Sequence, residues 1–243
     1  MPLAFNEKTM ARRSVLAGGL ALATSGCAAS QPFANAATTG PALWTFDRLA
    51  VIGGHPTTVE GDPRLTDSPF GPSVLFDGTN DALFIDHHPL AGAEHFTFEA
   101  LFRPDGGAHE QRWFHLQETP PAMGAEHWPG TRFLFEIRIY DRQWCLDAFT
   151  KGPGYNQVLI FPDKLHHVGE WAHVAQTYDG VTYRSFVNGV LQGEAPLAFQ
   201  PQGAGATSVG CRFNRINYFH GAVRAAAFSH LALEPQTFSL LKS

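Results

Sequence analysis

The sequence has few cysteines and, beyond its first forty residues, no long apolar run. Cys27, Cys145 and Cys211 are too few for a disulfide framework and show no CxxC spacing, which excludes a small disulfide-rich scaffold and a CxxC metal site. No later apolar segment approaches the roughly 20 residues of a transmembrane helix. We therefore expect no membrane-spanning segment.

Charged residues are also scarce, and basic residues do not predominate. Only 16% of the 243 residues are charged, and the net charge of −5 argues against a nucleic-acid-binding surface, which is normally basic. The sequence has no HExxH motif, no G-x-S-x-G elbow and no glycine-rich phosphate loop. Adjacent histidines such as His87-His88 point to opposite faces of a strand, so no catalytic metal site is predicted.

The beginning of the chain has the features of an export signal. Arg12-Arg13 precede an apolar stretch over 15–23, and small residues follow. The paired arginines before Ser14 are similar to a twin-arginine signal, which implies bacterial export of a folded protein to the periplasm or the medium. We expect a signal peptide over 1–36 and a linker over 37–42.

Two processing sites compete in this segment. Ala34-Asn35-Ala36 fits a small-x-small cleavage site, which would release a soluble protein that begins near Ala37. Thr24-Ser25-Gly26-Cys27 is similar to a lipobox and would place a lipid anchor on Cys27, although Thr24 stands where an aliphatic residue is usual. Soluble release is favoured, and lipid attachment stays open.

The remaining chain alternates apolar and polar residues between regularly spaced turns. Alternation is clear over 96–103, 132–140, 173–178 and 183–187, and Asp-Gly or Asn-Gly follows the last two segments. This period of two, bounded by such turns, is typical of antiparallel strands and hairpins. Many short strands of this kind predict an all-β sandwich or jelly roll.

Several segments resemble laminin-G-like domains of the concanavalin A-like superfamily. The run W-A-H-V-A-Q-T-Y-D-G over 171–180, followed by F-V-N-G, is similar to the central signature of that family. Residues 74–81, 96–104 and 219–224 are similar to its other core strands, in the same order. The resemblance implies a jelly-roll β-sandwich of two antiparallel sheets over 43–243. Relatives include lectins, glycoside hydrolases, polysaccharide lyases and protein-binding modules, so the fold alone does not assign a function.

Alternation places a set of polar side chains away from the core. If Phe133 and Phe135 face the core, the neighbouring positions face outward, and the same argument applies to the segments around Phe98 and Phe114. The resulting polar face contains Glu99, His115, Gln117, Glu136, Arg138 and Tyr140. Arginine suits carboxylate recognition, and carboxylates and amides bind sugar hydroxyls, so we expect a carbohydrate site here. A solvated face with one Glu–Arg pair is the alternative.

Two enzymatic mechanisms can be written on this face. A glycoside hydrolase needs two carboxyl groups, for which Glu99 and Glu136 are the candidates. A polysaccharide lyase needs a cation beside the uronate and a proton-abstracting group. Arg138 would supply the cation, and Tyr140, His115 or Tyr155 the base.

Loops and a second polar set are predicted to complete the site. A breaker-rich stretch over 118–131, which contains Trp128, is expected to overhang the polar face, and 151–156 is expected to form a tighter loop. A further polar set either lines the same cleft as substrate-binding residues or satisfies buried backbone groups near the closing strands; it consists of Asp147, Arg212, Asn214, Arg215 and Asn217. Arg212 and Asn214 are expected on one face of a strand.

Two further features stay open. Asp77, Asn80 and Asp81 could offer oxygen ligands to a structural Ca²⁺, although the same residues are typical of a plain turn. Cys145 and Cys211 either form one disulfide or remain free thiols.

The sequence as a whole indicates an exported protein that binds a polysaccharide or oligosaccharide through the polar face, with no required cofactor. The lyase, the hydrolase and a non-catalytic lectin-like or protein-interaction module remain alternatives. A protein-interaction module would show an exposed apolar patch in place of a charged cleft.

Overall fold

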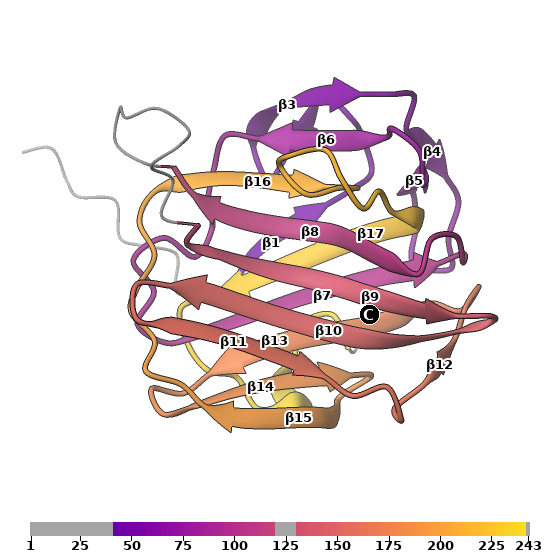
Figure 1. Ribbon diagram of the computed structural model, residues 1–243. Coiled ribbons are helices and arrows are strands. Elements are labelled where there is room, and N and C mark those ends of the chain that lie inside the picture. Colours follow the sequence, from indigo (N-terminus) through magenta and orange to yellow (C-terminus); the bar gives the residue numbers. More distant parts are fainter. Residues whose placement is uncertain (1–40, 120–129, 242–243) are drawn as a thin grey trace, which may run out of the picture. The chain divides into compact units, whose positions relative to one another are not determined.

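The computed structural model describes residues 41–119 and 130–241. These residues form two antiparallel β-sheets packed face to face (Figure 1), which confirms the expected all-β sandwich. The eight-stranded sheet contains, in spatial order, β15 (Val190–Pro196), β14 (Thr182–Val187), β13 (Ala172–Tyr178), β7 (Phe96–Pro104), β17 (His220–Ser229), β5 (Ser73–Asp77) and β4 (Arg64–Thr66), with β1 (Ala42–Thr45) also paired to β17.

The second sheet is nine-stranded within the described residues. It contains, in spatial order, β11 (Tyr155–Ile160), β10 (Gln143–Gly152), β9 (Arg132–Tyr140), β8 (Glu110–Glu118), β16 (Gly205–Val209), β6 (Ala82–Ile85), β3 (His55–Glu60) and β2 (Val51–Ile52), with β12 (His166–His167) also paired to β10. A short 3₁₀ helix, η2 (Pro235–Thr237), follows β17.

The predicted turn chemistry connects the hairpins. Asn188 and Gly189 have φ of 50° and 75°, so they form a two-residue turn between Val187 and Val190, which are paired in register. Only residues that tolerate positive φ fit both positions of such a turn. The expected loop over 151–156 is tighter than predicted, because Lys151 and Asn156 already pair across the β10–β11 hairpin.

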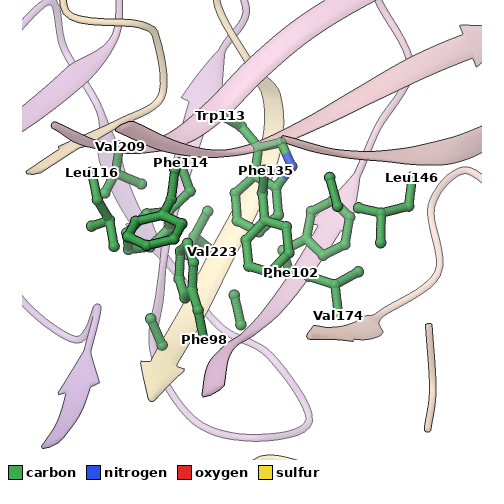
Figure 2. Close-up of a cluster of buried hydrophobic side chains, with 14 of the residues drawn as sticks. Phe98, Phe102, Trp113, Phe114, Leu116, Phe135, Leu146, Val174, Val209 and Val223 are labelled. Carbon is green, nitrogen blue, oxygen red and sulfur yellow. The ribbon is translucent and has the colours of Figure 1, made fainter. Parts of the chain in front are cut away.

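Aromatic side chains fill the space between the sheets. Phe98 and Phe102 of β7 meet Trp113 and Phe114 of β8 and Phe135 of β9 (Figure 2), and all five are fully buried. The rings of Phe102 and Trp113 stack with centroids 4.2 Å apart. Burial of such large apolar surfaces is the main stabilising term of a two-layer sandwich.

A β-bulge interrupts β8. The register with β9 shifts between Arg112 and Phe114, so Trp113 and Phe114 both enter the core. The extra residue reverses the alternation before it. Arg112 therefore points to the outer face of the nine-stranded sheet, where simple alternation from Phe114 would have placed it in the core.

The outer face of the eight-stranded sheet is covered by the segment after β17. Glu99 of β7 accepts hydrogen bonds from the backbone N–H groups of Ser239 and Leu240, each at 3.0 Å. Its carboxylate also lies 3.0 Å from Nε2 of His173, and Phe238 packs against the His173 ring. Glu99 thus anchors the end of the described chain.

The two cysteines within the described residues are free and buried. Cys145 lies on β10 and Cys211 follows β16, and neither forms a disulfide. Burial raises the pKa of Cys145 to about 11 and that of Cys211 to about 12. Both are therefore protonated, unreactive thiols near neutral pH.

Candidate functional site

The outer face of β8–β11 carries its side chains in rows, because residues paired in register point to the same side. One row is ionic, the next is largely apolar and the third is basic or amide-bearing. The ionic row consists of Arg112, Glu136 and Asp147, with Glu110 and Arg138 in the adjoining positions. The apolar row consists of His115, Leu134, Phe149 and Val158. The basic row consists of Gln117, Arg132, Lys151 and Asn156.

The ionic row and its neighbours form a connected network, here called the central network. Arg138 Nη2 lies 2.6 Å from Asp147 Oδ2, and Arg138 Nη1 lies 3.3 Å from Glu136 Oε2. Arg112 donates from Nε to Glu136 Oε2 at 3.0 Å and also binds Glu110. Such paired guanidinium and carboxylate groups hold one another in fixed orientations.

The carboxylates of the central network are buried, unlike those of an ordinary solvated sheet face. Glu136 is 4% exposed and Asp147 is 3% exposed, although both side chains belong to the outer face. Burial, together with the nearby charge of Glu136, raises the pKa of Asp147 to about 7. Asp147 Oδ1 is buried and has no hydrogen-bond partner among the described residues. Asp147 therefore exchanges a proton near neutral pH and keeps one oxygen free.

The apolar row places an aromatic ring between two polar rows. Phe149 of β10 is half-buried, and the Arg132 guanidinium lies over its ring at 4.9 Å from the centroid. Val158 beside it on β11 is 43% exposed. A strip of this kind offers apolar contact flanked by hydrogen-bonding groups, which is the usual composition of small-ligand sites.

The loop between β16 and β17 closes one side of this face. Phe213 N–H donates to His115 Nδ1 at 3.3 Å, and the two rings lie 5.0 Å apart. Burial lowers the pKa of His115 well below its usual value, and the charges of Arg212 and Arg132 lower it further. His115 is therefore neutral, with its hydrogen on Nε2.

Six of the predicted residues lie on one face, but their roles differ from those expected. Glu136, Arg138, Asp147, His115, Gln117 and Tyr140 are all on the outer face of β8–β10. Arg138 binds three carboxylates, so it is not a free cation for a uronate. Tyr140 is exposed at the end of β9, where its ring contacts His109. The neutral, buried His115 is poorly placed to act as a base.

The predicted pair of Glu99 and Glu136 is wrong. Glu99 lies on β7 in the eight-stranded sheet, and Glu136 lies on β9 in the other sheet. Both were correctly placed outside the core, but the two outer faces lie on opposite sides of the sandwich. Alternation identifies the outward side chains of each strand and does not say which sheet the strand joins.

The predicted role of Tyr155 is also wrong. Its side chain belongs to the core, where its hydroxyl donates to the carbonyl of Gln200 at 3.3 Å and accepts from Gln202 Nε2 at 3.2 Å. Burial raises the pKa of Tyr155 to about 12. Because β11 pairs with β10, Tyr155 faces the same side as the core residue Ala148 and cannot reach the outer face.

The predicted strand around Arg212 is a turn. Arg215 N–H donates to the carbonyl of Arg212 at 2.7 Å, and Arg215 has φ of 58°. Arg212 is half-buried beside the central network, whereas Asn214 is exposed at the tip of the turn. Trp128, the proposed roof of the site, lies outside the described residues.

Three contributors to this face, Arg112, Glu110 and Phe149, were not predicted from the sequence. Arg112 was hidden by the bulge, and Glu110 lies beyond the same irregularity. Asn217, a member of the second polar set, accepts a hydrogen bond from Arg112 across the loop. Phe149 was detectable, because it alternates with Ala148 and Thr150 on a strand whose other face is buried.

The predicted calcium ligands are engaged in turns. Asp77 Oδ1 accepts from the N–H groups of Thr79 and Asn80, and Asp81 accepts from those of Asp62 and Asp77. They line a cavity of about 660 Å³ with His220. Among the described residues, no three His, Cys, Asp or Glu side chains are grouped to hold a metal ion. Calcium binding stays a prediction.

No helix within 41–119 and 130–241 has the length and apolar character of a membrane span.

Comparison with solved structures finds domains of the same architecture. Domain 4 of the arabinanase AbnA from Geobacillus stearothermophilus, solved in complex with arabinotriose, superposes with a TM-score of 0.60 and 16% identity, over 84% of this chain and 100% of that chain. The receptor-binding domain of botulinum neurotoxin D superposes with a TM-score of 0.56 and 12% identity, over 82% of this chain and 51% of that chain. The K499G mutant of NanB sialidase from Streptococcus pneumoniae superposes with a TM-score of 0.53 and 16% identity, over 74% of this chain and 27% of that chain. At these identities the likeness concerns the fold alone.

No curated protein matches the sequence. The family model Laminin_G_3, described as the concanavalin A-like lectin/glucanases superfamily, matches residues 77–237, which is more than half of the chain. The match covers the whole of β6–β17 and every segment of the laminin-G resemblance except residues 74–76 at its start. The chain therefore belongs to the concanavalin A-like lectin/glucanases superfamily.

Proposed function

We propose that this protein binds a polysaccharide or oligosaccharide on the outer face of β8–β11. The observation that carries the proposal is the alternation of rows on that face. A half-buried Phe149 and exposed Val158 lie between the central network and the row of Arg132 and Lys151. A sugar has apolar C–H surfaces and polar hydroxyls, so such a strip matches both parts of a sugar chain.

The outer face of the eight-stranded sheet is less accessible, which favours a binding site on the outer face of β8–β11. The outer face of the eight-stranded sheet is covered around Glu99 by the chain end, including the buried Phe238. The outer face of β8–β11 instead leaves Tyr140, Asn156 and Val158 exposed. The complex of AbnA domain 4 with arabinotriose adds support by analogy of fold, because that whole domain superposes on this chain.

The test is binding of the purified protein to immobilised neutral and acidic polysaccharides. We expect binding to at least one of them, and at least about ten-fold weaker binding for Glu136→Gln, because the central network loses a charge-assisted contact. Glu94→Gln, an exposed glutamate in the loop before β7, is the matched control and should bind like the parent protein. Absence of binding to every polysaccharide would reject the proposal.

A hydrolase is the second candidate, supported by Glu136 and Asp147. These carboxyl groups lie opposite each other on β9 and β10, and the pKa of Asp147 is about 7. A glycosidase needs one protonated and one ionised carboxyl group, which such an environment provides. Release of reducing ends that disappears in Asp147→Asn would establish this candidate. Release of unsaturated uronates would indicate a lyase instead.

We also propose that residues 1–36 direct export of the protein, by the twin-arginine features described above. The two processing alternatives, soluble release and a lipid on Cys27, differ in mass and in membrane association of the mature protein. Mass spectrometry of the exported form distinguishes them.

A further inference from the structure

The basic row contains cations without acidic partners. Arg132 and Lys151 are directly opposite each other in the β9–β10 register, and both side chains belong to the outer face. Like charges in this position destabilise a sheet unless an anion lies between them. Within the described part of the chain, neither residue has a carboxylate within 4.0 Å, and the same holds for Arg212.

These cations differ from the other arginines on the same face. The sequence has 22 acidic and 17 basic residues, so carboxylates are in excess. Arg112 and Arg138 on the same face are both paired with carboxylates. Within the described residues Arg142, Lys164 and Arg224 also lack a carboxylate partner, but Arg132, Lys151 and Arg212 lie beside a network in which both arginines are neutralised.

Unused hydrogen-bond donors accompany these charges. Arg132 binds the carbonyl of Gly130 through Nη1 at 2.8 Å, but its Nε is buried without a partner among the described residues. His115 Nε2 is likewise buried and unpartnered there. Burial, with a contribution from the charge of Arg212, lowers the pKa of Arg132 to about 10. Phe213, the residue after Arg212, donates to His115 on β8, next to the row that holds Arg132. Buried donors without partners are costly and indicate a missing acceptor.

We infer that Arg132, Lys151 and Arg212 form a subsite for an oxyanion of the bound carbohydrate, so that the ligand is an acidic sugar chain carrying carboxylate or sulfate groups. Guanidinium groups bind both anions through paired hydrogen bonds. Phe149 beneath Arg132 would contact the sugar ring that carries the anion. This inference rests on the proposed function and specifies its ligand class.

The test compares matched polymers that differ in the anion. The full protein is titrated with polygalacturonate and its fully methyl-esterified form, and with dextran sulfate and dextran. We expect at least about ten-fold tighter binding to one charged polymer than to its neutral counterpart. Arg132→Gln/Lys151→Gln and, separately, Arg212→Gln should remove this preference, whereas Arg184→Gln, on the other sheet, should keep it. Unchanged thermal unfolding verifies that the variants fold.

The outcomes separate the two proposals. Preference for polygalacturonate identifies a carboxylate ligand, and preference for dextran sulfate identifies a sulfate ligand. Equal binding to charged and neutral polymers, or a preference that survives in both sets of variants, would overturn the oxyanion subsite and leave the carbohydrate proposal intact. Binding to none of these polymers or of the wider panel would overturn the carbohydrate proposal itself.

Discussion

Asp147 of β10 lies directly opposite Glu136 of β9, and both carboxylates bind the same guanidinium, that of Arg138. The pair is almost fully buried on the outer face of the sheet. Burial and the neighbouring negative charge keep the pKa of Asp147 at about 7, so one of the two carboxyl groups is partly protonated under physiological conditions.

This shift predicts a pH dependence of stability. An unfolded Asp releases its proton near its ordinary pKa of 3.8, whereas the folded protein holds it until about pH 7. Folding therefore takes up a proton between these values, and the free energy of unfolding should fall as pH rises through this window. Urea denaturation of Asp147→Asn should lack this part of the pH dependence. An identical pH profile for variant and parent would contradict the assignment.

Direct titration provides an independent check. The side-chain carbonyl carbon of Asp147, followed by NMR, should titrate with a midpoint near pH 7. Asp179, which accepts backbone and arginine hydrogen bonds, should titrate near pH 2 and serves as the internal reference. A midpoint near 4 for Asp147 would show that its burial has little electrostatic effect.

The contacts of Glu99 predict a structural role on the opposite face. Glu99→Ala removes the acceptor of two backbone N–H groups and leaves His173 without its partner. The expected loss of unfolding free energy is about 3 kcal/mol, measured by chemical denaturation. Polysaccharide binding by the folded variant should be unchanged. A selective loss of binding would instead show that Glu99 takes part in the binding site.

The position of Tyr155 predicts that it has no catalytic role. Tyr155→Phe removes hydrogen bonds to Gln200 and Gln202 while it keeps the ring in the core. We expect a loss of about 1 kcal/mol in unfolding free energy and no change in any sugar-directed activity. Loss of activity without loss of stability would contradict the structure at this residue.

A substitution in the aromatic core should reduce the free energy of unfolding more than Tyr155→Phe does. Phe102→Ala removes a ring that stacks on Trp113 and lies against Trp144. The cavity left in a closely packed core should cost about 3–5 kcal/mol, visible as a lower denaturant midpoint. Phe102→Leu, which keeps most of the volume, should lose markedly less. Equal losses for both variants would argue against tight packing at this point.

The alternation of side chains predicted most of the fold and half of the site. It placed Phe98, Phe135 and Ile137 in the core and Glu136 and Arg138 outside it, because a strand buried on one side has a strict period of two. It did not identify Arg112, because a single extra residue in β8 reverses the pattern there. No local signal in the sequence marks this bulge.

The remaining errors of the sequence-based prediction concern how strands pair with one another. Glu99 and Glu136 are both outward, yet they lie on different sheets, since sheet membership depends on partners far away in the sequence. Tyr155 was assigned to a loop because Gly152, Pro153 and Gly154 precede it, but the hairpin is so tight that Tyr155 already pairs with Gly152 and faces the core. The β-turn was recognised correctly, and only its length was wrong.

The most direct test of a carbohydrate site on the outer face of β8–β11 is to locate the ligand by NMR. Isotope-labelled protein is titrated with an oligosaccharide of the polymer that binds best. We expect backbone amide shifts to concentrate at Phe149, Lys151 and Val158 and their neighbours on β9, with none on β13 or β14. Shifts concentrated in the cavity around Asp77 and Asp81, or on the eight-stranded sheet, would contradict it.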